Sequence, residues 1–350
     1  MTASRPLQIG ILGAARIARL FVNGVRPSRN VAVRAVAARD AGRARSLARE
    51  LQIPHIHPTY EALLADPEID AVYNPLPNSL HAEWSIRAAN AGKHVLCEKP
   101  LAASASEARA MFEAARRNKV YLVEAYPYLA QPVTRKLREL LAAGAIGRLQ
   151  LIQAYIGFTI GNPADIRMDP ALAGGALMDG GSYPVSLVRM IAGARPQRVQ
   201  AMARWADSGV DRAMLASLDF ADGLMAQIGC SFSTAAHRHA VIGGDAGVIE
   251  TRFYNHTTDA LPATLEVKRG TTWDASRETL ACAQTDGFLA EAESFRDLLE
   301  HGWERWTGAT PEESVDILLT MEALAASARP AGEGGTGSSC RAAIRGSPGR

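Results

Sequence analysis

Apolar residues in the first part of the chain cluster in short runs that alternate with stretches of helical spacing. The runs of strand length lie at 7–12, 31–38, 69–73, 94–97 and 120–124. The stretches between them that carry one apolar face lie at 41–51, 79–91 and 104–118. Strands that alternate with helices of about 10–15 residues predict parallel strands joined by right-handed crossovers. We therefore expect one parallel sheet in this part of the chain.

The pattern changes after about residue 126, where strand-like runs follow one another with short connections. These runs lie at 149–157, 198–206, 211–220, 224–233, 238–243, 247–254 and 263–269. Asp222-Gly223 has the composition of a hairpin turn between two of them. Helical spacing occurs at 132–143, 183–192, 288–300 and 311–328. Short connections between strands favour a mostly antiparallel sheet.

These two patterns predict an α/β fold with two domains. We expect a nucleotide-binding domain with a parallel sheet over residues 1–125, and an α+β domain that presents the substrate over 126–330. A chain of 350 residues is long enough for two hydrophobic cores. Residues 331–350 are rich in glycine and serine and lack periodicity, so a disordered tail is predicted there.

The bulk composition argues against several classes of partner. A net charge of +2 gives no reason to expect nucleic acid or an anionic membrane, and no apolar run approaches the ~18 residues of a membrane span. The first residues lack the apolar core of a signal peptide, so a cytoplasmic location is expected. The cysteines are scattered, and we interpret them as reduced thiols rather than as a disulfide framework or a metal site. They are Cys97, Cys230, Cys282 and Cys340.

A turn of small residues follows the first strand and opens a helix. It matches the dinucleotide fingerprint G-x-G-x-x-G only at its first glycine, with alanine at the other two glycine positions. The backbone is still able to approach a pyrophosphate, and the free N–H groups at the helix start attract phosphate. The alternative is a small-residue turn of any α/β domain. The residues assigned to the cofactor are Gly13, Ala14, Ala15, Arg16 and Ile17.

The end of the second strand bears on which cofactor is bound. NAD-specific sites usually place an acidic side chain there, against the ribose hydroxyls. This chain has Arg39 followed by Asp40, with Arg43 nearby. An arginine at this point favours a 2′-phosphate through its charge and bidentate geometry, so NADP is expected rather than NAD. Asp40 would still be able to bind a ribose hydroxyl, and the alternative is that both arginines are solvated surface residues.

The loop after the third strand is a second candidate for cofactor contact, because parallel sheets bind ligands at the carboxyl ends of their strands. Its two prolines hold the loop extended, and its carbonyl groups are expected to line the nicotinamide ribose. His81 opens the following helix and is a further candidate, with a histidine bonded locally at the helix start as the alternative. The loop residues are Asn74, Pro75, Leu76, Pro77 and Asn78.

The loop after the fourth strand begins with Glu98-Lys99-Pro100. Hydride transfer to or from an alcohol needs a group that exchanges the hydroxyl proton. Lys99 would polarise the oxygen as a cation, or would exchange the proton itself if its surroundings lower its pKa. Glu98 would orient Lys99 or balance its charge. The alternative is a surface glutamate–lysine pair.

Residues 173–184 contain four glycines just before a helix. Such a density of glycine suggests close approach of the backbone to a ligand, or a tight turn. Asp179 and Tyr183 are four residues apart and would face the same cleft if Tyr183 starts the helix. A phenol near a lysine is a plausible proton donor. The alternatives are Asp179 as a helix cap and Tyr183 as a half-buried packing residue.

Taken together, these segments resemble the Gfo/Idh/MocA family, named for glucose–fructose oxidoreductase and inositol dehydrogenase. Glu-Lys-Pro after a strand, combined with Asp-Gly-Gly-Ser-Tyr-Pro, is specific, and the likeness covers about residues 7–329. The resemblance implies a Rossmann domain and a C-terminal domain with a large open sheet, through which a homodimer or tetramer is expected. The stretches that carry the resemblance are 9–18, 71–81, 92–101, 174–184, 243–250 and 288–300.

Tyr183 stands where many members of the family have histidine. This form is similar to the branch of dihydrodiol dehydrogenases, NADP-dependent xylose dehydrogenases and glucose–fructose oxidoreductase. The resemblance implies NADP-dependent hydride transfer between nicotinamide C4 and a carbinol or carbonyl carbon of a sugar or related polyol. It also implies that Tyr183 exchanges the proton, that Lys99 lowers the pKa of Tyr183 and holds the oxygen, and that Asp179 orients substrate hydroxyls. Tyr155 and Arg167 are added as substrate contacts because they lie near the glycine-rich segment.

Three other functions stay open for a chain of this kind. An NAD-dependent glycosidase of the same family would not consume its cofactor. A trans-dihydrodiol dehydrogenase would share the chemistry and differ in substrate. A non-catalytic regulator that senses NADP would bind the cofactor without turnover. Within the leading hypothesis, a free sugar, a nucleotide-linked keto-sugar and an aromatic dihydrodiol all remain candidate substrates.

Overall fold

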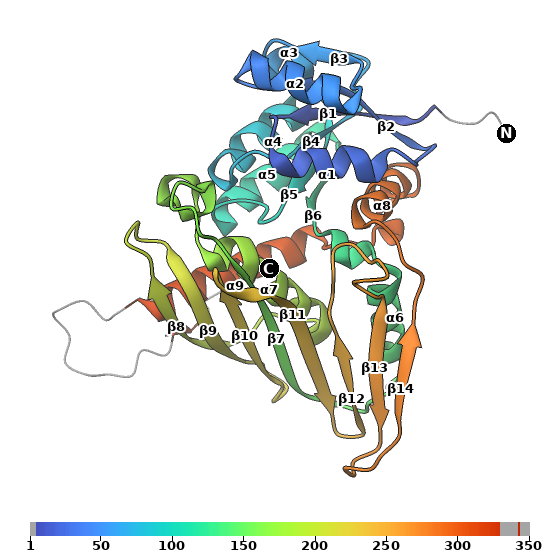
Figure 1. The fold of residues 1–350 in the computed structure, drawn as a ribbon, viewed down its shortest axis with the longest axis vertical. Helices are drawn as coiled ribbons and strands as arrows, with labels where there is room; N and C mark the ends of the chain where they lie inside the picture. Colours follow the sequence, from blue (N-terminus) through green and yellow to red (C-terminus); the bar gives the residue numbers. More distant parts are fainter. Residues whose placement is uncertain (1–4, 330–341, 344–350) are drawn as a thin grey trace. The chain divides into compact units, whose positions relative to one another are not determined.

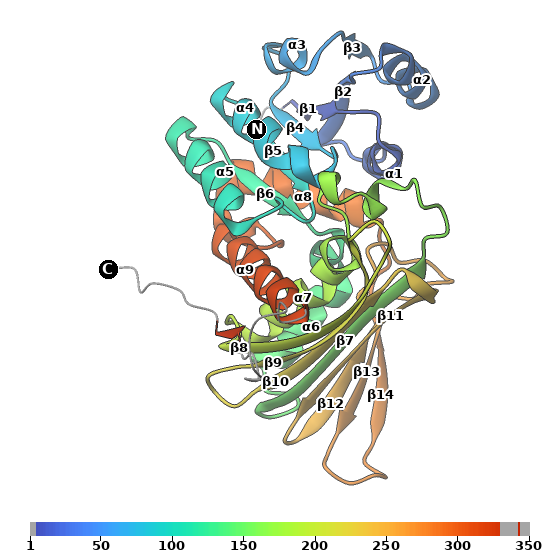
Figure 2. The same ribbon diagram turned by 90° about the vertical axis from the view of Figure 1, so that its left-hand side faces the viewer.

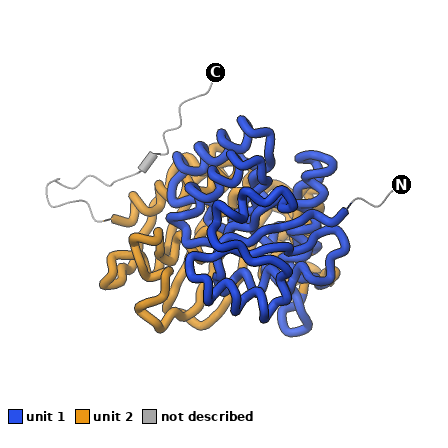
Figure 3. Tube along the Cα trace, turned by 90° about the horizontal axis from the view of Figure 1, so that it is seen from above, with its two compact units in different colours: residues 1–132, 255–262, 284–311 blue, residues 133–254, 263–283, 312–350 orange. Residues whose placement is uncertain are grey.

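The computed structural model describes residues 5–329 and 342–343, and the chain forms two compact units (Figure 3). The first unit comprises residues 1–132, 255–262 and 284–311. The second comprises residues 133–254, 263–283 and 312–350. The chain thus returns twice to the first unit, whereas the sequence pattern suggests a single division near residue 125.

The first unit is built on six parallel strands in the order β3-β2-β1-β4-β5-β6 (Figure 1). The strand order reverses between β1 and β4, so the loops after these strands flank the point where such sheets bind ligands. The strands are β1 (Leu7–Leu12), β2 (Val31–Ala37), β3 (His55–His57), β4 (Ala71–Asn74), β5 (His94–Glu98) and β6 (Leu122–Ala125). The helices are α1 (Arg16–Val25), α2 (Ala41–Leu51), α3 (Tyr60–Leu64), α4 (His81–Asn90), α5 (Ala105–Asn118) and α8 (Gly287–His301).

The predicted strands and helices of this unit are all present, with ends that differ by a few residues. The sequence pattern does not indicate β3 and α3, which are three and five residues long. Elements this short do not complete enough turns or alternations to produce a periodic signal. The parallel sheet predicted for the first part of the chain is confirmed.

Helix α8 brings a late part of the chain into the core of the first unit. Phe288, Phe295 and Leu298 of α8 are fully buried in the same apolar cluster as Phe21 of α1. The ring of Phe21 stacks on Tyr73 of β4 at 3.9 Å and meets Phe288 edge-on at 5.8 Å. Burial of these large side chains is what makes α8 part of this unit rather than of the second one.

The second unit contains a sheet in the order β14-β13-β12-β11-β7-β10-β9-β8-β15 (Figure 1). Every neighbouring pair is antiparallel except β7 and β10, so the predicted mostly antiparallel sheet is confirmed. Gly223, with φ +86°, lies in the predicted turn between β9 and β10. The strands are β7 (Leu149–Thr159), β8 (Arg198–Trp205), β9 (Asp211–Asp219), β10 (Met225–Ser231), β11 (Ser233–Gly244), β12 (Gly247–Thr251), β13 (Thr264–Arg269), β14 (Arg277–Ala281) and β15 (Ala342–Ala343).

Helices α6 (Pro132–Ala142), α7 (Ser182–Ala192) and α9 (Pro311–Ala328) lie on one face of this sheet (Figure 2). Successive side chains of a strand point to opposite faces, and β7 follows this rule. Ile152 and Ala154 are buried on the helix side, whereas Leu151 is 52% exposed and Gln153 is exposed on the other side. The second face of the sheet is therefore open.

Two features near the edges of this sheet differ from the prediction. The polar strand β14 is absent from the predicted strands because its residues, Arg-Glu-Thr-Leu-Ala, lack the apolar alternation of the others. Residues 331–341 and 344–350 of the predicted disordered tail lie outside the described residues, but Ala342–Ala343 pair with β8. Such pairing uses backbone groups alone, so composition does not predict it. No helix within the described part of the chain is long and apolar enough to cross a membrane.

Candidate active site

The turn after β1 has the backbone of a phosphate-binding loop. Gly13 adopts φ +96°, and a Cβ placed on it would lie 2.9 Å from Cδ2 of Leu76 in the loop after β4. Ala15 precedes α1 and provides no side-chain hydrogen bond to cap it. The N–H groups at the start of α1 are therefore available to an anion, with the partial positive charge of the helix behind them.

Two arginines lie beside this turn at the end of β2. Arg39 and Arg43 are exposed, and Nη2 of Arg43 donates to the carbonyl of Ala14 at 3.1 Å. Burial raises the pKa of the neighbouring Tyr60 hydroxyl, while its hydrogen bond with Arg39 opposes that rise. The two guanidinium groups thus stand next to the phosphate-binding loop. Residues of this charge and placement fit the 2′-phosphate of NADP.

Asp40 has a structural role that its position at the strand end does not reveal. Its Oδ1 accepts hydrogen bonds from the backbone N–H groups of Gly42 at 2.7 Å and Arg43 at 3.1 Å, which caps α2. These two hydrogen bonds hold the pKa of Asp40 below its ordinary value. The carboxylate is therefore engaged at the helix start, and the arginines dominate the charge beside the cofactor loop.

The loop after β4 is held by buried polar side chains. Nδ2 of Asn74, which is fully buried, donates to the carbonyl of His81 at 3.2 Å and to Oγ of Ser85 at 3.0 Å. Its Oδ1 accepts from the N–H of Leu76 at 3.3 Å. Asn74 is thus a support for the loop, and the expected contacts of this loop with a nicotinamide ribose stay a prediction.

The ring nitrogens of His81 contact nearby backbone carbonyls, which agrees with the alternative of a locally bonded histidine at the helix start. The ring is buried, with Nε2 2.7 Å from the carbonyl of Leu76 and Nδ1 2.9 Å from the carbonyl of Pro100. Burial lowers the pKa of His81 to about 4, although both carbonyls favour the protonated ring. His81 therefore ties the loop after β4 to the loop that carries Lys99.

Lys99 directly follows β5, at the carboxyl edge of the parallel sheet. Glu98, the last residue of β5, is 7% exposed and accepts a hydrogen bond of 2.5 Å from the hydroxyl of Tyr73 on β4. The backbone N–H of Lys99 donates to Oε2 of Glu98 at 3.3 Å, and the Lys99-Pro100 peptide is cis. Glu98 is thus a buried anchor of this loop, which argues against the surface-pair alternative.

In the second unit, Asp179 and Tyr183 lie on one continuous helical segment. A π-helical turn, η5 (Leu177–Gly181), leads directly into α7, so Asp179 does not cap the helix with its side chain. Its carboxylate lies 3.5 Å from Nη1 of Arg167, whose Nη2 also pairs with Asp165 at 2.8 Å. The structure therefore brings Arg167 to Asp179, and the predicted contact of Arg167 with substrate stays a prediction.

Tyr155 does not belong to this group. Ile156 and Phe158 of β7 lie toward η5, as their closeness to Gly180 shows. Tyr155 lies between these positions in the alternation and projects from the opposite face, where its hydroxyl is 3.4 Å from Oε1 of Gln227. The pleat of the strand therefore separates Tyr155 from Asp179, and the predicted contact of Tyr155 with substrate stays a prediction.

Several residues near these groups escape the sequence analysis. The guanidinium of Arg238, on β11, lies 4.1 Å from the ring centre of Tyr183. Asp211 of β9 accepts the N–H of Leu177 at 2.7 Å and so holds the start of η5. Glu291 of α8 is buried near Glu98, and both its burial and the charge of Glu98 raise the pKa of Glu291. Of these residues, Arg238 left a signal in the sequence, because it occupies an inward position of a strand at which the alternating residues Ala240 and Ile242 are apolar.

Comparison with known proteins assigns the chain to a family. Residues 7–126 match the model of the oxidoreductase family with an NAD-binding Rossmann fold, and residues 134–250 match the GFO/IDH/MocA C-terminal domain. A D-xylose 1-dehydrogenase (NADP(+)) 2 of Haloferax volcanii is 39% identical over 330 residues, covering 92% of this chain and 97% of that protein. The chain belongs to the Gfo/Idh/MocA family. It is an NAD(P)-dependent oxidoreductase, as the resemblance implies.

Other similar proteins are named for activities on different substrates. A trans-1,2-dihydrobenzene-1,2-diol dehydrogenase of Danio rerio is 36% identical over 248 residues, which cover 70% of this chain and 74% of that protein. Among solved structures, KijD10, a 3-ketoreductase from Actinomadura kijaniata in complex with NADP and TDP-benzene, superposes with a TM-score of 0.83 at 29% identity. That match covers 93% of this chain and 98% of KijD10. An aldose-aldose oxidoreductase from Caulobacter crescentus, complexed with glycerol, gives the same TM-score and coverage at 25% identity.

Proposed function

We propose that this protein is an NADP-dependent oxidoreductase that acts on a sugar or a related polyol. The observation that carries the proposal is the position of Lys99, which follows β5 at the carboxyl edge of the nucleotide-binding sheet and is anchored through Glu98. The names of the D-xylose dehydrogenase and the 3-ketoreductase support a carbinol or carbonyl substrate. Reduction of a nucleotide-linked keto-sugar is included in this proposal.

The choice of NADP rests on the charge at the end of β2. Arg39 and Arg43 present two guanidinium groups beside the phosphate-binding loop, while Asp40 is engaged as the cap of α2. A 2′-phosphate gains charge-assisted hydrogen bonds from such a pair, which a 2′-hydroxyl does not. We therefore expect the dissociation constant of NADPH to be at least tenfold lower than that of NADH.

In the proposed reaction, each protein group has one task. NADP, when bound, accepts or supplies the hydride at nicotinamide C4. The hydroxyl of Tyr183 gives a proton to the carbonyl oxygen during reduction and takes it back during oxidation. Lys99 holds the same oxygen with its ammonium group and favours loss of the tyrosine proton. Asp179, steadied by Arg167 at 3.5 Å, orients the substrate hydroxyls.

Two measurements test this function. Fluorescence titration with NADPH and NADH measures the preference that Arg39 predicts, and Arg39→Ala should reduce it. Turnover is then assayed against aldoses, keto-sugars and nucleotide sugars with the wild type, Lys99→Met and Tyr183→Phe. Loss of either side chain is expected to lower kcat by about 10²–10⁴-fold. Turnover within about tenfold of wild type in Lys99→Met would show that Lys99 has another role.

A dihydrodiol substrate is the second candidate, because the Danio rerio relative is named for one. The same assay panel should therefore include a trans-dihydrodiol of benzene. If the protein oxidises this dihydrodiol with a kcat/KM above that of every sugar tested, the proposed hydride transfer is retained and the proposed substrate class is replaced. The site residues and their tasks would be unchanged, because both substrates lose a hydride from a carbinol carbon.

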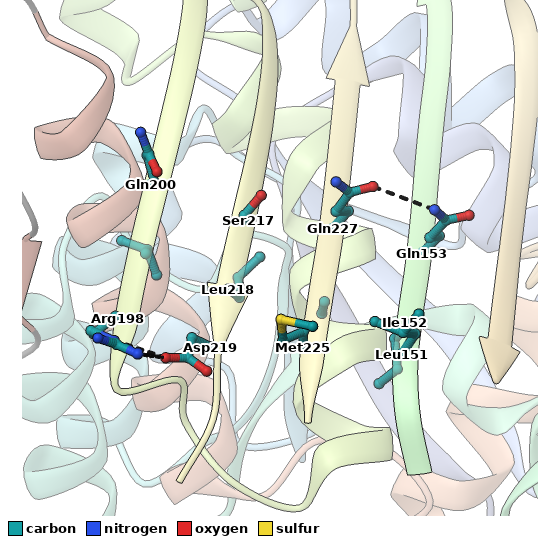
Figure 4. Close-up of a pocket in the computed structure, with 12 residues that line it drawn as sticks. Leu151, Ile152, Gln153, Arg198, Gln200, Ser217, Leu218, Asp219, Met225 and Gln227 are labelled. Carbon is teal, nitrogen blue, oxygen red and sulfur yellow. Dashed lines mark hydrogen bonds and ion pairs between the residues drawn. The ribbon is translucent and has the colours of Figure 1, made fainter. Parts of the chain in front are cut away.

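We also propose that the open face of the large sheet binds a second copy of this chain. Leu151, Met202, Leu215 and Met225 are between 52% and 64% exposed on this face. Neutral amide and hydroxyl groups lie in a row between them, at Gln200, Ser217, Gln227 and Gln153 (Figure 4). The strands here enclose a hollow of about 530 Å³.

An exposed apolar face of this extent is uncommon on a monomer and favours association. Arg198 and Asp219, which pair with each other, also line this hollow. Light scattering after size-exclusion chromatography should give a dimer or a tetramer for the wild type. Leu215→Lys should shift it toward the monomer, whereas Arg117→Ala, a change at an exposed position of α5 in the first unit, should not. A monomeric wild type at micromolar concentration would contradict the proposal.

A further inference from the structure

Tyr183 has a cationic neighbour within its own unit that the family resemblance did not point to. The guanidinium carbon of Arg238 lies 4.1 Å from the centre of the Tyr183 ring and 4.7 Å from the ring of Phe253. Its Nε and Nη2 are shielded from solvent. Tyr183 is 7% exposed and Phe253 is 2% exposed, so both rings surround the charge with an apolar environment.

The register of the sheet explains why an arginine occupies this position. Arg238 pairs with Ile156 of β7, whose side chain faces η5. Ala240 and Ile242 continue the same side of β11 and are fully buried. An arginine therefore replaces an apolar residue at the inward position nearest to Tyr183. Burying a charged side chain at such a position is costly unless neighbouring groups stabilise the charge, so its presence there indicates a specific role.

A cation over an aromatic face is attracted by the ring, and the attraction grows when the ring carries a negative charge. Loss of the phenolic proton converts Tyr183 from a neutral ring into an anion, whose charge lies mainly on the oxygen and is partly delocalised into the ring that the guanidinium faces. An opposite charge within about 4–6 Å favours the ionised form of an acid by about one to three pH units. The ring of Phe253 adds no competing charge to this environment.

The other ionisable groups near Tyr183 in this unit do not replace Arg238. Asp179 on η5 carries a negative charge, which opposes ionisation of the phenol, but it is partly balanced by Arg167 at 3.5 Å. Burial raises the pKa of Asp211 on β9 and that of the Cys230 thiol on β10. A neutral thiol supplies no positive charge, and neither does a carboxyl in either of its forms.

We propose that Arg238 is a positioning residue that holds the Tyr183 ring and stabilises its phenolate form, and so sets the pH at which Tyr183 exchanges its proton. This inference rests on the proposed function, in which Tyr183 is the acid–base group. It assigns to a residue of β11 part of the task that the resemblance gives to Lys99 alone. The same effect applies in both directions of the reaction, because reduction needs the phenol and oxidation needs the phenolate.

Ultraviolet absorbance of tyrosinate tests the inference without any substrate. The pH titration of Tyr183→Phe is subtracted from that of the wild-type protein, which leaves the ionisation of Tyr183 among the eight tyrosines. The same subtraction is made in an Arg238→Met background. We expect the midpoint for Tyr183 to move by one pH unit or more toward alkaline pH in Arg238→Met. An unmoved midpoint overturns the inference.

Two further variants separate charge from packing. Arg238→Lys keeps the charge and should retain at least half of the wild-type effect, while Arg238→Gln should behave as Arg238→Met. Equal midpoints for the lysine and glutamine variants would overturn the role of the charge, and this comparison also serves if Arg238→Met does not fold. Arg269→Met is the matched control, because Arg269 is an exposed residue paired with Glu278 at 2.7 Å. Its midpoint should equal that of the wild type.

Kinetics distinguish failure of this inference from failure of the proposed function. The limb of the kcat–pH profile that reports Tyr183 should move with the absorbance midpoint in Arg238→Met and should be absent in Tyr183→Phe. Arg238→Met should add little further loss in a Tyr183→Phe background, because both changes act on the same proton. Full activity in Tyr183→Phe would refute the proposed function. An inactive Tyr183→Phe together with an unmoved limb in Arg238→Met would refute only the role of Arg238.

Discussion

Replacing Glu291 with glutamine is expected to increase the stability of the protein by an amount that grows as the pH rises. Both carboxyl oxygens of Glu291 are buried, and within residues 5–329 neither has a hydrogen-bond partner. Burial raises the pKa of Glu291 well above its ordinary value, and the nearby Glu98 raises it further. The folded protein therefore keeps a proton that the unfolded chain releases once the pH passes about 4.5.

The magnitude follows from this difference in proton binding. Above the ordinary pKa, each pH unit costs the wild-type protein about 1.4 kcal/mol of stability, until the raised pKa of the folded state is reached. Glutamine has nearly the same shape and does not ionise, so it removes this cost. The unfolding free energy of Glu291→Gln relative to the wild type should then rise with pH above about 4.5, by up to about 1.4 kcal/mol per pH unit, until the raised pKa of the folded state is reached.

Urea unfolding followed by circular dichroism measures this difference, at steps of about half a pH unit. Glu304→Gln is the matched control, because Glu304 is an exposed carboxylate of the same unit and its loss should leave the pH dependence unchanged. A stability difference that is flat across the range, or that shrinks as the pH rises, would refute the conclusion that Glu291 folds in its protonated form.

Three further outcomes follow from single side chains. Gly13→Ala should weaken NADPH binding more than about tenfold and destabilise the protein by about 1–2 kcal/mol. The reason is that Gly13 has φ +96° and that the new Cβ would meet Leu76. Fluorescence titration measures the loss of binding, and urea unfolding measures the loss of stability. The contribution of His81 to the stability of the wild-type protein should fall by about 3 kcal/mol as the pH drops from 6.5 to about 4, because the unfolded chain protonates His81 before the folded one does. His81→Leu should abolish this contribution in the same unfolding assay and should be less stable at neutral pH, since one of the two backbone carbonyls that face the neutral ring loses its donor; an unchanged pH dependence would contradict it. Tyr155→Phe should leave kcat within about twofold of wild type in the turnover assay, and a loss of about a hundredfold would restore it to the site.

The sequence by itself determined what depends on neighbours along the chain. The alternation of apolar runs predicted the parallel strands, and the glycine-rich turn at Gly13 and the lysine directly after β5 were identified from local pattern alone. These features share a physical basis: strand and helix periods, turn conformations and the position of a loop after a strand are properties of short segments. The resemblance to the Gfo/Idh/MocA family rests on the same segments, and the comparisons confirm it.

Only the tertiary structure decided which distant side chains meet. The sheet register brings Arg238 of β11 against Tyr183 of α7, and the burial of α8 brings Glu291 near Glu98. The pleat of β7 separates Tyr155 from Asp179. Contacts of this kind depend on strand pairing and helix packing between segments far apart in the chain, and a shift of one residue in strand register would send each side chain to the opposite face of the sheet.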